Sequence, residues 1–169
     1  MPTRSTAAAT LIVSTCLAAA TALATTVAPS DREGAADWDV VCASPESCTV
    51  SRTVINTEAN ERVATLSIEV TGDTQSLTVT APLGVAVAPG VRMVMGETVT
   101  DLPILVCLPT GCLSARALDD DALRSLAALD TVEFRFFGFG SERPFSVSMD
   151  LDGLQEVLAD TVTWRGDWP

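Results

Sequence analysis

The chain has 169 residues, with 22 acidic residues, 10 basic residues that are all Arg, and neither His nor Tyr, which gives a formal net charge of −12. Without His and Lys it has no Ser-His-Asp triad, no Cys-His pair, no Schiff-base lysine and no His-ligated catalytic metal. The negative charge argues against nucleic acid and anionic lipid as partners, because both bind basic patches.

The first 24 residues have the pattern of a secretory signal peptide. Arg4 precedes an apolar run, and Ala22-Leu23-Ala24 places small residues at both positions that signal peptidase recognises. We expect cleavage after residue 24, with Ala28 as a later alternative, and the loss of Arg4 changes the net charge from −12 to −13. A retained membrane anchor is one alternative, although the run is mostly Ala and Thr rather than strongly apolar. A lipid-modified Cys16 is a second alternative. The apolar run continues past this cysteine, which argues against it.

The mature chain is expected to form one domain without a transmembrane span. Residues 25–36, rich in small and polar types, form a flexible lead-in. Residues 37–160 contain no repeat or low-complexity stretch, and a mature chain of about 140 residues is long enough to bury a hydrophobic core. The polar residues 161–169 form a C-terminal tail.

Four cysteines follow the signal peptide in two close pairs, Cys42 with Cys48 and Cys107 with Cys112. An exported protein enters an oxidising compartment, which pairs an even set of cysteines. Three connectivities are possible, and the sequence does not choose among them. Closing the two short loops separately is the simplest, because Pro and Gly inside the second loop suit a turn between strands. A zinc site is the alternative, but zinc sites favour closer pairs and this chain has no His.

Much of the mature chain alternates apolar and polar residues with the period of two that half-buried strands show. Residues 65–70 and 76–81 alternate in this way around Thr71-Gly72-Asp73, which predicts a β-hairpin. We expect further strands at residues 38–42, 48–56, 85–87, 91–95, 104–108, 112–118, 132–139 and 145–149.

Two short helices interrupt this pattern. Asp119-Asp120-Asp121 precedes an apolar stripe between Ala122 and Leu129, and acidic residues at a helix start bond the free amides and suit the helix dipole. A calcium site is the functional alternative, but an EF-hand loop alternates its ligands and ends in a distant Glu. A second helix is expected at residues 151–158. The predicted fold is mainly β, an antiparallel sandwich or barrel-like single domain with two short α-helices.

Five segments in chain order resemble the invasion-associated locus B family of exported bacterial proteins. They are Trp38-Asp39-Val40-Val41-Cys42, Cys48, Ala81-Pro82-Leu83-Gly84-Val85, Cys107-Leu108-Pro109-Thr110-Gly111-Cys112 and Met149-Asp150-Leu151-Asp152-Gly153-Leu154. The resemblance covers residues 37–158 and is most specific at the Cys-x-x-x-Gly-Cys turn. It implies a periplasmic or outer-membrane-associated protein of a Gram-negative bacterium. Members are linked to host-cell invasion or envelope function, and the family offers no catalytic residues to carry over.

We expect a non-enzymatic, disulfide-stabilised envelope protein, without cofactor or metal, that binds an envelope or host protein. Phe137 and Phe139 are candidate partner-binding residues if one face of their strand meets solvent. A strand covered on both faces would give the same sequence. In the tail, Trp164 and Trp168 are further candidates.

Two other functional classes remain open. A carboxylate-dependent hydrolase acting on an envelope polysaccharide would need two facing carboxyl groups, one of them with a raised pKa. A redox protein would use the cysteine pairs, but no Cys-x-x-Cys motif is present to lower the pKa of a thiol.

Overall fold

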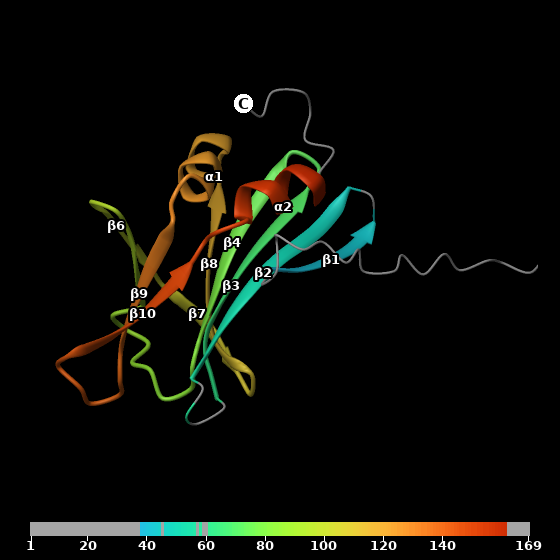
Figure 1. Cartoon of the computed structure of the whole chain (residues 1–169). Helices are drawn as coiled ribbons and strands as arrows, with labels where there is room; N and C mark the ends of the chain where they lie inside the picture. The colour runs from blue at the N-terminus through green and yellow to red at the C-terminus, as the bar shows by residue number, and fades with distance from the viewer. Residues whose placement is uncertain (1–37, 45, 57, 59–60, 162–169) are drawn as a thin grey trace, which may run out of the picture. The chain divides into compact units, whose positions relative to one another are not determined.

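The computed structural model describes residues 38–44, 46–56, 58 and 61–161 (Figure 1). The expected signal peptide and lead-in lie outside these residues, and so does the chain after Thr161. The described residues form ten strands in two antiparallel sheets, and two helices.

The larger sheet has six strands in the order β1-β2-β3-β4-β8-β7, so β1 and β7 are its edges. The predicted hairpin is formed by β3 and β4, whose ladder ends at the pair Thr71 and Thr74. Gly72 lies in the turn between them with a φ of +56°, a conformation that favours glycine. The bounds are β1 (Asp39–Ser44), β2 (Ser47–Asn56), β3 (Glu61–Thr71), β4 (Thr74–Ala81), β7 (Ile104–Leu108) and β8 (Gly111–Leu118).

The smaller sheet has four strands in the order β10-β9-β5-β6. Its strands are β5 (Val91–Met95), β6 (Thr98–Leu102), β9 (Thr131–Phe137) and β10 (Pro144–Asp150). β6 is absent from the predicted strands. Only Pro103 separates it from β7, so the chain passes from one sheet to the other at a sharp corner.

The two sheets share one hydrophobic core, to which alternate residues of each strand contribute. Leu66 and Leu77 of the larger sheet are fully buried, and so are Phe134 and Phe136 of the smaller sheet. Residues between them in sequence, such as Glu69 and Arg135, lie on the outer faces. The predicted mainly β, antiparallel sandwich is therefore confirmed.

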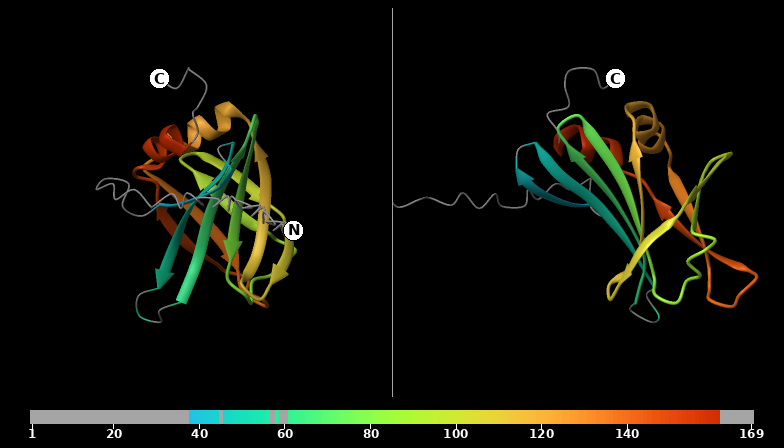
Figure 2. Two further views of the ribbon diagram at one scale, coloured as in Figure 1. Left: turned by 90° about the vertical axis from the view of Figure 1, so that its right-hand side faces the viewer. Right: turned by 180° about the vertical axis from the view of Figure 1, so that it is seen from behind.

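Both helices lie at the same end of the sandwich (Figures 1 and 2). In α1 (Asp120–Ala127) the Oδ1 of Asp119 accepts a hydrogen bond of 2.7 Å from the N–H of Ala122, so this aspartate is a helix cap, as predicted. The apolar stripes of α1 and α2 (Leu154–Thr161) complete the core with the buried side chains of Leu123, Leu126, Leu154, Val157 and Leu158.

Two predicted elements are wrong in detail. Residues 85–87 are not a strand, because prolines and positive-φ glycines flank them; Val85 forms only an isolated bridge to Gly138. The second helix begins at Leu154 rather than Leu151, because Gly153 has a φ of +77°, which a right-handed helix does not allow.

Candidate functional site

The structure contains both short-range disulfides, Cys42 to Cys48 and Cys107 to Cys112. In each bridge the two cysteines are register partners, one on an edge strand and one on its inner neighbour. The bridges therefore fasten β1 to β2 and β7 to β8, at both edges of the larger sheet. Closing loops of this length contributes about 2 kcal/mol per bridge in the chain-entropy model.

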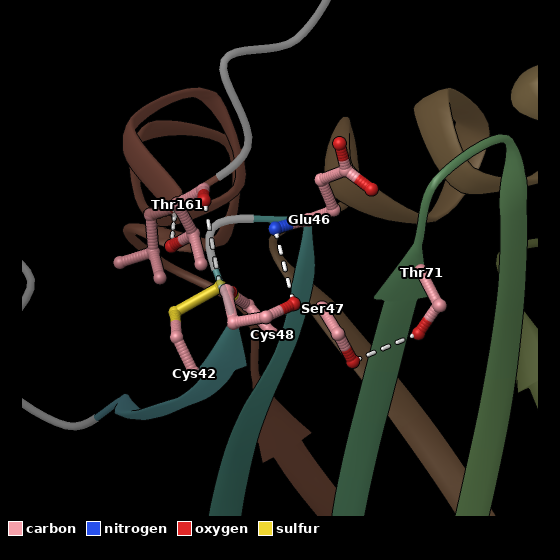
Figure 3. The surroundings of a disulfide bond; sticks show 8 residues. Cys42, Glu46, Ser47, Cys48, Thr71 and Thr161 are labelled. Carbon is pink, nitrogen blue, oxygen red and sulfur yellow. Dashed lines mark hydrogen bonds between the residues drawn. A yellow bond between two sulfur atoms is a disulfide. The ribbon is translucent and has the colours of Figure 1, made fainter.

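The first bridge also positions the end of α2 (Figure 3). Cys48 is buried, and its Sγ lies 3.6 Å from the carbonyl oxygen of Thr161. A disulfide sulfur carries no hydrogen, so we regard this as a packing contact. Beside it, the hydroxyls of Ser47 and Thr71 are 3.0 Å apart and share a hydrogen bond between β2 and β3. The last turn of α2 is thus packed against the β1–β2 hairpin.

Trp38 closes the adjacent side of the core. Its side chain is buried, and its Nε1–H donates a hydrogen bond of 2.9 Å to the carbonyl oxygen of Asp152. The guanidinium carbon of Arg52 lies 5.6 Å from the centre of the Trp38 ring, a cation–π distance. These contacts connect the start of β1 to the turn before α2, and they give Trp38 a packing role.

Exposed apolar side chains gather at the end of the sandwich away from the helices. Phe139 is 89% exposed and Leu83 is 59% exposed. The segments that carry them, residues 82–90 and the loop between β9 and β10, lie together at that end (Figures 1 and 2). We call the exposed set the rim, and it comprises Leu83, Val87, Leu108, Phe139 and Phe145.

Backbone hydrogen bonds hold the rim segments together. The N–H of Phe139 donates to the carbonyl oxygen of Gly84 at 2.8 Å, and the N–H of Ala86 donates to that of Phe137 at 2.7 Å. The ring of Phe145 packs against the buried ring of Phe136, with ring centroids 5.3 Å apart. The rim is therefore a fixed part of the fold.

The turn of the second disulfide hairpin borders the same end. Gly111 has a φ of +139°, and a Cβ placed there would lie 2.5 Å from the carbonyl oxygen of Ala81, the last residue of β4. Only glycine allows this close approach. It places Leu108, the register partner of Gly111, beside the start of the segment that carries Leu83.

The rim segments that carry Leu83, Val87 and Leu108 are uncharged in a chain of net charge −12, whereas the loop between β9 and β10 carries Glu142 and Arg143. No charged residue occurs between Asp73 and Arg92, and none between Asp101 and Arg116. Acidic surfaces are usually solvated, whereas an exposed set of apolar side chains is typical of an interaction surface. This is the signal by which Leu83, Val87 and Leu108 could have been found in the sequence.

The predicted partner-binding residues have different environments. Phe139 belongs to the rim, whereas Phe137 is half-buried on the outer face of the smaller sheet, on the same side of β9 as Glu133 and Arg135. Trp164 and Trp168 lie outside the described residues.

Two ion pairs also lie on that outer face. The guanidinium of Arg135 donates to both carboxylate oxygens of Glu133, at 2.9 and 3.1 Å, and Arg92 donates to Asp101 at 2.8 Å. The hydrogen bonds from Arg135, with a further one from Ser146, lower the pKa of Glu133 from 4.5 to about 2. The same pair raises the pKa of Arg135.

We expect Glu133 to make stability depend on acid pH. Because folding favours the charged carboxylate, its contribution is present above pH 4.5 and is lost as the pH falls towards 2. The stability difference between wild type and E133Q should therefore shrink over this interval, as measured by denaturant midpoints at several pH values. The effect is small because the pair is partly exposed. E97Q, which removes a carboxyl from the β5–β6 turn, controls for the loss of one negative charge.

Glu133 does not fit the general acid that the hydrolase alternative requires. A raised pKa is needed for a general acid, and that of Glu133 is lowered. A surface depression of about 470 Å³ lies between α1 and α2, and Asp130, Asp152 and Glu156 are among its lining residues. Apart from Gln155, the other lining residues are small or apolar.

The described residues contain neither a cluster of metal ligands nor a membrane-spanning helix. No group of three or more Cys, Asp or Glu residues is arranged to hold a metal ion in the part of the chain that the structure describes. Within the same part, no helix is long and apolar enough to cross a membrane.

Two packed antiparallel sheets, the larger with a disulfide at each edge, define the class of protein, which is a small disulfide-stabilised β-sandwich. The family model described as Invasion associated locus B (IalB) protein matches residues 38–161, so the chain belongs to this family, and the resemblance seen in the sequence is confirmed. The family's proteins are exported, and the two disulfides fit an extracytoplasmic location.

A solved structure supports the fold. The crystal structure of invasion associated protein b from Bartonella henselae is similar to this chain, with a TM-score of 0.67 and 23% sequence identity. The match covers 77% of this chain and 94% of that chain. No curated protein matches the sequence significantly.

Proposed function

We propose that this protein is exported to the cell envelope and acts without catalysis, by binding another protein through the rim. The observation that carries the proposal is a fixed set of exposed apolar side chains, with Phe139 89% exposed, on an acidic protein. Aromatic side chains surrounded by smaller apolar ones are typical of the residues that dominate binding energy. The signal-peptide pattern of residues 1–24 and the disulfides support a periplasmic or outer-membrane-associated location, and the family description supports a role in association with host cells.

The charge distribution defines the chemistry of the partner. A net charge of −12 repels anionic surfaces and attracts cationic ones. The partner is therefore a protein that presents an apolar patch bordered by Arg or Lys. Its association rate should fall as salt is raised, because the charges that attract it lie outside the apolar contact.

The rim is tested by photo-crosslinking in source cells. A photoreactive phenylalanine analogue replaces Phe139 in one variant, Leu83 in a second and Val99 in a control. Val99 is also apolar and is 53% exposed, but it lies on β6, outside the rim. Positions 139 and 83 should yield the same crosslinked protein, and position 99 should not.

The identified partner is then purified and its affinity for single variants is measured. We expect F139S to weaken binding at least ~10-fold, as loss of a central aromatic contact does, while V99S stays within about twofold of wild type. Because Phe139 is exposed, the free energy of unfolding of F139S should match that of wild type. Equal affinities for F139S and wild type would refute the proposal.

A further inference from the structure

The edge strand β1 has an open side. The Cα atoms of Cys42 and Cys48 are only 3.9 Å apart, which is the closely spaced pairing in which neither residue bonds to the other through its backbone. The pairing alternates along the strand, so Val41 bonds to Thr49 on β2, while Val40 and Cys42 point their N–H and C=O groups away from β2. No strand of the described residues pairs with that side.

The side chains of β1 are also uncovered. Val40 is 44% exposed and Val41 is 69% exposed. Edge strands are usually protected by charges or proline, and Asp39 is the one charged residue within β1. An apolar edge of this kind is a template for another strand.

The described part of the chain ends beside this edge. The carbonyl oxygen of Thr161 lies 3.6 Å from the Sγ of Cys48, so the last described residue lies beside the disulfide that fastens β1. Residues 162–168 lie outside the described residues, and their sequence alternates with period two. The apolar or small residues Val162, Trp164, Gly166 and Trp168 alternate with the polar residues Thr163, Arg165 and Asp167.

We propose that residues 162–168 add to β1 as a seventh, antiparallel strand of the larger sheet. Trp164 then lies opposite Val40 on the inner face, and Arg165 lies opposite Asp39 on the outer face. Val162 lies opposite Cys42 in this register, and the residue before it, Thr161, packs against the disulfide that joins Cys42 to Cys48. A register shifted by two residues would instead place Asp167 opposite Asp39, where like charges repel.

Amide hydrogen exchange of the mature chain, followed by NMR with both disulfides formed, tests the pairing. The N–H of Val40 should exchange at least ~10-fold more slowly in the full chain than in a variant that ends at Thr161. The N–H of Val41 bonds to β2 in both proteins and should differ by less than about twofold, which provides an internal control. Equal Val40 rates in the two proteins would overturn the proposal. Protection of Val40 that grows with protein concentration would also overturn it, because a second copy would then supply the strand.

A charge exchange tests the register without shortening the chain. Asp39→Arg alone and Arg165→Asp alone each place like charges opposite one another, and each should speed exchange at Val40 about twofold or more. The double variant restores an opposite-charge pair and should return the rate to that of wild type. A double variant that exchanges as fast as the single variants would refute the pairing of Arg165 with Asp39.

Discussion

Replacing Gly111 with alanine is expected to lower the free energy of unfolding by about 3 kcal/mol or more. The residue has a φ of +139°, which is strained for any side chain, and the added Cβ would lie 2.5 Å from the carbonyl oxygen of Ala81 and 2.7 Å from the Cγ2 of Thr80. Both neighbours belong to β4, which strands on both sides hold in place, so the backbone has no room to move. Chemical denaturation of the oxidised protein measures the loss.

Gly72 provides the matched control. It also has a positive φ, +56°, but a Cβ there would meet no atom within 4 Å. G72A should therefore lower the free energy of unfolding by only about 1–2 kcal/mol, which is the cost of placing alanine in a left-handed conformation. If G111A and G72A lost the same stability, the close approach of the β7–β8 turn to β4 would not be what selects glycine in the Cys-x-x-x-Gly-Cys turn.

Local pattern was sufficient to predict most of the sandwich because its central strands are buried on one face. Leu66 and Ile68 of β3 are fully buried while Glu69 is exposed, and this contrast is what period-two alternation records. The Asp119 cap was predictable for a similar reason, since a helix start needs an acceptor within a few residues of the chain.

The sequence-based predictions fail where a strand has too few buried residues to alternate, or where the conformation of one glycine decides the boundary of an element. β6 has one buried residue, Leu102, so its five residues show no alternation, although Gly96 in the turn before it was a usable hairpin signal. The start of α2 depends on the conformation of Gly153, and an apolar stripe that includes Leu151 does not reveal it.

The rim was predictable only in part. Phe139 could be nominated from an aromatic strand, but Leu83, Val87 and Leu108 come from distant segments that backbone bonds and the close approach of Gly111 bring together. Tertiary contacts of this kind leave no periodic trace in the sequence. The lack of charge between Asp73 and Arg92 and between Asp101 and Arg116 was the available clue.

The second large effect is expected for Phe134, which should lose about 3–5 kcal/mol of stability when replaced by alanine. Phe134 is fully buried on the inner face of β9, where its ring lies 6.5 Å from that of Phe136 between the two sheets. Its removal would leave a cavity in the centre of the core, because β9 is hydrogen-bonded on both sides and cannot collapse into the space. Denaturant unfolding of the oxidised protein measures the change.

A comparison of F134A with F139A tests both the fold and the proposed function. It lies five residues further along the same aromatic segment and is 89% exposed, so F139A should change the free energy of unfolding by less than about 0.5 kcal/mol. F134A should therefore weaken folding, whereas F139A should leave folding intact and weaken only partner binding. A loss of stability in F139A as large as that in F134A would mean that the ring of Phe139 is packed inside the protein, and the rim would then lose its central residue.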